Sequence, residues 1–88
     1  MRLKFEEVKR IKEEFQGLYV FIDPYSKYTN GCGISIVGLQ DKKADSNTAK
    51  DFCIIVFLSK SLPQNLSIPI EYQNVKVFTM VVGKARLL

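Results

Sequence analysis

The chain has 88 residues, so we expect a single domain over residues 1–88. Hydrophobic residues make up 47% and charged residues 25%, values that exclude a disordered, collagen-like or low-complexity chain. Thirteen basic and nine acidic residues give a formal net charge of +4, spread along the sequence without a block of five like charges. Histidine is absent, which removes the commonest general base and the commonest metal ligand.

Residues 3–16 have the pattern of an amphipathic helix. Apolar side chains recur every three or four residues, and most of the positions between them are charged. Gly17 is predicted to follow the last helical residue, because the left-handed conformation common there is accessible to glycine. The apolar stripe consists of Phe5, Val8, Ile11 and Phe15.

Two strands are predicted in the middle of the chain. Residues 18–22 alternate between two faces, and the Pro of Asp23-Pro24 ends that pattern because proline cannot donate to a ladder. Residues 32–39 form the second strand, whose glycines at 33 and 38 indicate a bend or a close backbone approach. The polar residues 40–51 then predict an exposed loop with a helical turn.

The second half of the chain is richer in strands. The continuous apolar run at 52–59 predicts a central strand covered on both faces. Residues 70–72 and 75–82 predict a hairpin with a tight turn at Gln73-Asn74. One helix followed by strands with short connections predicts an α+β domain, in which the N-terminal amphipathic helix packs on a small, mainly antiparallel sheet of three to five strands. One helix covers one sheet face, so we expect the other face to contact loops or another molecule.

Three segments carry a pattern of glycines, prolines and strand residues. They are Asn30-Gly31-Cys32-Gly33-Ile34-Ser35-Ile36, then Phe52 to Leu58 with Lys60 and Pro63, and lastly Ile68-Pro69-Ile70 through Val75 to Gly83 and Lys84. In order and spacing they resemble the short α/β region that precedes the catalytic domain of bacterial trypsin-like serine peptidases. That family commonly has a glycine in the hairpin where this chain has Gln73-Asn74.

The resemblance implies a stand-alone relative of that leader-like region. The sequence reaches Leu88 at the point where the peptidase domain would begin. Without histidine, the Ser-His-Asp triad of the family cannot be built from these residues. The resemblance therefore implies no peptidase activity.

No catalytic, cofactor or metal site is predicted. Cys32 and Cys53 lie in apolar runs and are expected to be buried free thiols. The alternative is a disulfide between them, which requires that their strands are neighbours. Neither cysteine has a histidine partner to activate it as a nucleophile. The glycines near Gly31 are not followed by the Gly-Lys-Ser/Thr of a phosphate loop. We expect a protein that is not an enzyme and has no cofactor, and its short apolar runs predict no membrane span and a cytoplasmic location.

The loop at 23–31 is the best candidate for partner contacts. Tyr25 and Tyr28 flank Lys27, and exposed tyrosines are good contact residues, although a tyrosine here can instead pack over the sheet edge. Lys42 and Lys43 in the long loop add a second candidate surface. The leading hypothesis is a non-catalytic module that binds another protein or itself through an uncovered sheet face or edge. The alternative is a small basic nucleic-acid-binding domain that uses these tyrosines and lysines.

Overall fold

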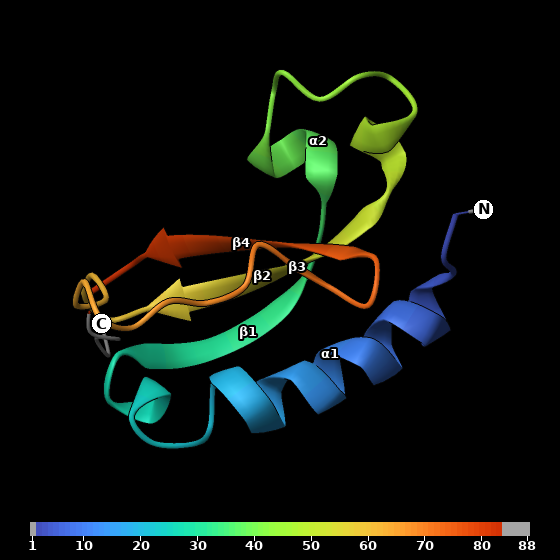
Figure 1. Cartoon of the computed structure of the whole chain (residues 1–88). Coiled ribbons are helices and arrows are strands. Elements are labelled where there is room, and N and C mark those ends of the chain that lie inside the picture. The colour runs from blue at the N-terminus through green and yellow to red at the C-terminus, as the bar shows by residue number, and fades with distance from the viewer. Residues whose placement is uncertain (1, 84–88) are drawn as a thin grey trace, which may run out of the picture.

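The computed structural model describes residues 2–83 and contains one long helix and a four-stranded sheet (Figure 1). Helix α1 packs on one face of the sheet, which confirms the predicted α+β class. The elements in chain order are α1 (Phe5–Tyr19), η1 (Tyr25–Lys27), β1 (Thr29–Ile36), α2 (Val37–Gln40), η2 (Thr48–Lys50), β2 (Phe52–Leu58), β3 (Glu71–Tyr72) and β4 (Val75–Val81).

Helix α1 is longer than predicted. Its stripe is buried at Val8, Ile11 and Phe15 as expected, but the helix continues through Gly17 to Tyr19. The predicted strand at 18–22 is therefore wrong. Tyr19 lies four residues after Phe15, and the two rings contact each other with centroids 5.1 Å apart. This packing outweighs the roughly 1 kcal/mol by which glycine weakens a helix interior.

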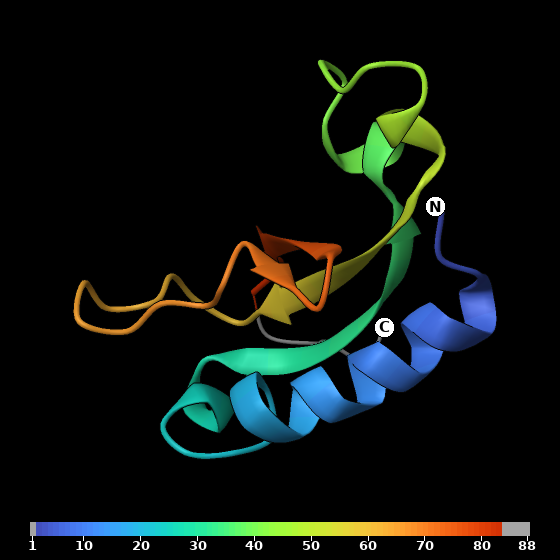
Figure 2. The same cartoon turned by 45° about the vertical axis from the view of Figure 1, so that its right-hand side comes forward.

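The strands of the sheet follow the order β1-β2-β4-β3. Strand β2 has a neighbour on each side, so the prediction of a central strand at 52–59 is confirmed. The sheet is mixed, because β2 and β4 run parallel while β1 pairs with β2, and β3 with β4, in antiparallel fashion. A parallel pair needs a long connection, and the loop after β2, which extends away from the sheet in Figure 2, supplies most of it.

Two local predictions have different outcomes. The turn at Gln73-Asn74 is confirmed, since both residues have positive φ angles, of 47° and 68°, as a type I′ hairpin turn requires. The predicted strand at 32–39 is shifted, because the observed strand ends at Ile36 and α2 follows. Gly38 therefore lies in α2. A Cβ atom there would lie 3.0 Å from Ala49, so the glycine allows α2 to approach η2 closely.

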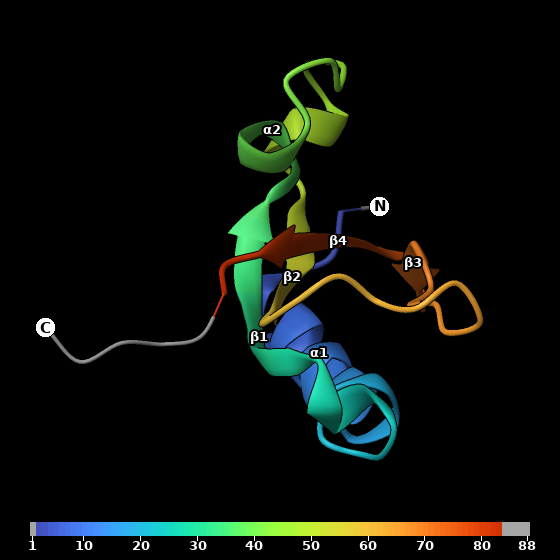
Figure 3. The same cartoon turned by 90° about the vertical axis from the view of Figure 1, so that its left-hand side faces the viewer.

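The two faces of the sheet are covered differently. On the α1 face, Ile54 and Val56 of β2 and Val77 of β4 belong to the buried core. On the opposite face, Cys53 near the start of β2 is buried, and α2 and residues 41–51 lie beyond that end of β1 and β2, away from α1 (Figure 3). Towards the other end of that face, Met80 of β4 is exposed. The predicted difference between the two faces therefore applies to part of the sheet.

Candidate functional site: the free edge of β4

Strand β4 has one side that is paired along its length and one side that is mostly open. From Val77 to Val81 it pairs with β2, but on its other side β3 reaches only Val75 and Lys76. One further bond closes this side, because the Val77 N–H donates to the Ile70 carbonyl over 2.9 Å. Beyond Val77, no strand among residues 2–83 pairs with this side of β4. We call residues 78–82 on this side the β4 edge.

The backbone of the β4 edge presents hydrogen-bonding groups that have no partner among residues 2–83. The Val82 N–H donates to the Leu58 carbonyl over 2.8 Å, so the groups of Val82 point towards β2. The backbone N–H and C=O groups of successive residues point to alternate sides of a strand. Thr79 and Val81 therefore point their N–H and C=O groups away from β2, into the open edge. Such a row of groups is a template for another strand.

All side chains of the β4 edge except Thr79 are apolar, and three of these apolar side chains are exposed. Met80, Val81 and Val82 are 43%, 55% and 49% exposed. Residues 77–82 contain no charged residue, proline or glycine. Natural proteins usually protect an open edge with lysine, proline, a bulge or a covering segment. The β4 edge has none of these sequence devices, which makes it the strongest candidate for a contact surface.

The apolar surface continues from the β4 edge onto the sheet face opposite α1. In the parallel register, Phe78 lies beside the buried Ile55 of β2, and Met80 lies beside the half-buried Phe57. The ring of Phe57 extends over Gly33 of β1, where an added Cβ would lie 3.8 Å from a ring carbon. A partner at the edge would therefore also meet this half-buried aromatic surface.

The structure gives the three candidate residues near η1 different roles. The Tyr25 hydroxyl donates to the Ser67 carbonyl over 2.9 Å, and the Tyr25 ring packs on Tyr19. Tyr25 thus takes the alternative role of packing against the fold. Tyr28 is half-buried with the Lys60 ammonium 5.1 Å from its ring centre, and Lys27 is exposed.

The other two candidate residues, Lys42 and Lys43, lie far from this group. They are exposed in the turn after α2, at the end of the sheet opposite to η1 (Figure 1). The structure does not bring them together with Tyr25 and Tyr28 in one surface. Their contact with a partner stays a prediction.

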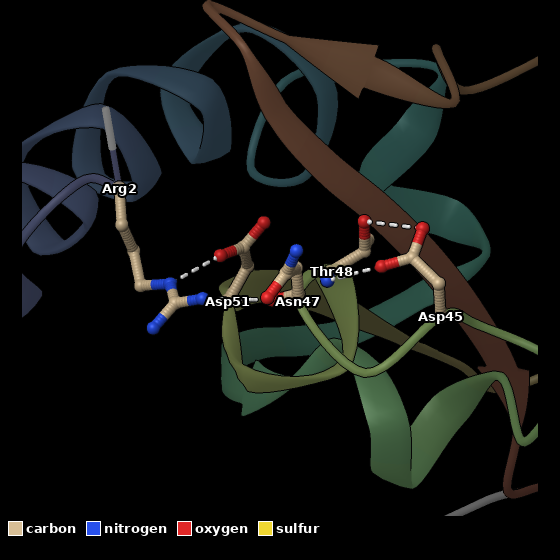
Figure 4. Close-up of polar contacts among 5 residues, drawn as sticks. All are labelled: Arg2, Asp45, Asn47, Thr48 and Asp51. Carbon is tan, nitrogen blue, oxygen red and sulfur yellow. Dashed lines mark hydrogen bonds and ion pairs between the residues drawn. The ribbon is translucent and has the colours of Figure 1, made fainter.

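A small cavity lies near the start of α1. Arg2 donates through Nε to Asp51 over 2.7 Å and through Nη2 to the Asn47 carbonyl over 2.8 Å (Figure 4). The cavity beside them has a volume of about 270 Å³, and its lining includes no cysteine or serine. Arg2 and Asp51 beside the cavity already form an ion pair with each other, so we propose no catalytic or binding role for the cavity. The lining residues are Arg2, Leu3, Asp51, Phe52 and Asn74.

The same figure shows the residue that orders the loop before β2. The Asp45 carboxylate accepts hydrogen bonds from the backbone N–H of Thr48 over 2.8 Å and from its hydroxyl over 3.2 Å (Figure 4). These bonds, the backbone bond first, lower the pKa of Asp45 below its usual value. The charged form of Asp45 is therefore favoured in the folded chain.

We expect Asp45→Ala to reduce the midpoint of thermal unfolding at neutral pH and to have a smaller effect in strong acid, where the parent carboxyl is neutral. The pKa of Asp45 is lower in the folded chain, so the unfolded chain binds more protons as the pH falls. The stabilisation by the Asp45 carboxylate is present above the pKa that Asp45 has in the unfolded chain. It is lost as the pH falls through the lower pKa that Asp45 has in the folded chain. Melting curves of the parent and of Asp45→Ala over a series of pH values measure the difference between their unfolding midpoints. Asp45→Asn keeps an acceptor without the charge, so its melting difference from the parent should be smaller; equal curves for all three proteins would contradict this role.

Both cysteines are free thiols, but only Cys53 is fully buried as predicted; Cys32 is half-buried. Burial raises the pKa of Cys32 and of Cys53, which favours the thiol over the nucleophilic thiolate. Their strands are neighbours, yet Cys32 lies opposite Val56 and Cys53 opposite Ser35, so the two side chains do not meet. The Cys32 thiol instead donates to Gln16 Oε1 over 3.4 Å.

Comparisons of the chain with protein-family models, with curated proteins and with solved structures found no match. The resemblance to the leader-like region of trypsin-like peptidases therefore stays a prediction. Among residues 2–83, no helix is both long and apolar enough to cross a membrane. In the same residues, no group of three metal-ligating side chains gathers at one place.

Proposed function

We propose that this chain is a non-catalytic protein-interaction module that takes a strand of its partner onto the β4 edge. The observation that carries the proposal is the pair of outward-facing residues, Thr79 and Val81, in an exposed apolar segment without charge. Strand addition of this kind uses main-chain hydrogen bonds for affinity and alternate side chains for specificity.

The β4 edge is held in place by the rest of the fold. Strand β4 pairs with the buried central strand β2 over five residue pairs, from Ile54 with Val77 to Leu58 with Val81. A partner would therefore meet an extended edge that is already formed. Such preorganisation lowers the conformational entropy lost on binding.

The nucleic-acid alternative has less support. Of the two tyrosines it invokes, Tyr25 uses its hydroxyl and its ring within the fold. Base stacking needs an open aromatic face beside a basic groove. Lys42 and Lys43 lie at the other end of the sheet and do not supply that groove (Figure 1).

Selection from a library of short random peptides tests strand addition. Thr79→Pro removes an outward N–H but no bond between β4 and β2, so we expect peptides selected on the parent chain to bind this variant at least about tenfold more weakly. Thr79→Val is the matched control, because it keeps the N–H and the branched side chain, and its binding should be unchanged. Titration of labelled peptides measures both affinities, with circular dichroism to check the fold.

Two outcomes would count against strand addition. The first is a selection that yields no peptide bound by the parent chain. The second is a set of peptides that bind the parent and Thr79→Pro equally well, since their binding would then not use the β4 edge.

A further inference from the structure

The β4 edge also indicates which strand fills it. We infer that the partner strand is β4 of a second copy of this chain, running antiparallel, with Met80 of one copy opposite Met80 of the other. This inference rests on the proposed strand addition and adds the identity and the register of the partner.

The free backbone groups select this register. A two-fold axis at Met80 places Thr79 opposite Val81 of the second copy, and Val81 opposite its Thr79. Each such pair exchanges two N–H···O=C bonds, so every outward group of the two residues is used. An axis at Thr79 would instead place Val81 opposite Val77, whose N–H is already bonded to the Ile70 carbonyl.

The two ends of the free segment also fit this register. Ile70 closes the edge at Val77. At the other end Gly83 has a φ of 73°, so the extended conformation ends after Val82. An antiparallel pair centred on Met80 places Phe78 opposite Val82 of the second copy. The paired segment therefore ends where each chain turns or is already covered.

The charge pattern is compatible with a second copy. The chain carries a net charge of +4, but Lys76 is the one charged residue of β4 and lies outside the paired segment. Identical segments can therefore meet without like charges in opposition. Across the pair, Thr79 meets Val81 on one face and Phe78 meets Val82 on the other; β-branched and aromatic pairs of this kind stabilise a sheet.

The resulting dimer has a defined architecture. The two-fold axis of an antiparallel pair at this position stands perpendicular to the sheet. The two sheets therefore join into one, with both α1 helices on the same face. On the opposite face the two Met80 side chains meet, with Phe78 of each copy beside Val82 of the other, and these contacts cover the exposed surface of Met80 and Val82.

Charge reversal at Met80 tests this pairing. Sedimentation equilibrium at rising concentrations, up to about 0.5 mM because a small interface is weak, should show the parent chain passing from monomer to dimer. Met80→Lys and Met80→Glu each place like charges opposite each other, and each should raise the dissociation constant at least about tenfold. An equimolar mixture of the two variants should recover the dimer. Leu39→Lys changes an exposed apolar residue of α2 away from the edge and should leave the dimer intact.

Three results would overturn the inference: a parent chain that stays monomeric, a dimer that survives Met80→Lys, or a mixture that does not recover. A monomeric parent whose selected peptides still depend on the N–H of Thr79 would leave the proposed strand addition in place and exclude only the second copy as partner. If the peptides fail as well, both proposals are wrong.

Discussion

Replacing Phe15 with alanine is expected to lower the free energy of unfolding by about 3–5 kcal/mol. The Phe15 side chain has 0% of its surface exposed. Its ring contacts Tyr19 within α1, at 5.1 Å, and Tyr72 of β3, at 5.5 Å. Truncation therefore leaves a cavity where α1 meets β3, the edge strand of the sheet. Small domains are stable by only about 5–15 kcal/mol, so the variant should be close to unfolding.

Urea unfolding followed by circular dichroism measures this loss, and Phe5→Ala is the control at the other end of the same stripe. Phe5 is 46% exposed and makes an edge contact with Phe52 at 5.5 Å. We expect the control to lose at most about 1.5 kcal/mol, because nearly half of the Phe5 side chain stays exposed to water in the folded chain. Equal losses for the two variants would mean that α1 does not pack through Phe15.

The contrast within α1 shows what the local pattern could predict. The spacing of Val8, Ile11 and Phe15 was sufficient for the helix and its buried face. Tyr19 continues the same spacing by four residues, but Gly17 predicts that the helix ends before it. The low helix propensity of glycine is a local effect of about 1 kcal/mol, and the contact between Phe15 and Tyr19 outweighs it.

The candidate site was harder to predict because it depends on strand order. The sequence indicated an apolar strand at 75–82, and its lack of charge between Val77 and Val82 was visible. Whether that strand lies in the centre or at an edge follows from its parallel pairing with β2, which is set by contacts between distant residues. No local pattern encodes that pairing. The sequence instead points to the tyrosines of the loop at 23–31, because it does not show that the Tyr25 hydroxyl donates to the distant Ser67 carbonyl.

Ile54→Ala tests the central position of β2 and is expected to lower the free energy of unfolding by about 2–5 kcal/mol. Ile54 is fully buried and lies between Ile34 of β1 and Val77 of β4 in the sheet. Removal of its side chain affects both neighbouring strands. Urea unfolding, at a protein concentration low enough for association to be negligible, measures this loss in the free energy of unfolding.

Met80→Ala is the matched comparison for Ile54→Ala. Met80 lies on the partly exposed side of β4, so its truncation in the monomer should lower the free energy of unfolding by at most about 1.5 kcal/mol. The same substitution should weaken self-association, because Met80 is at the centre of the inferred pair. If Met80→Ala instead destabilises the dilute chain as much as Ile54→Ala, then Met80 supports the monomer fold. Its exposed surface would then not be available for a partner, and the β4 edge would lose its main apolar contact.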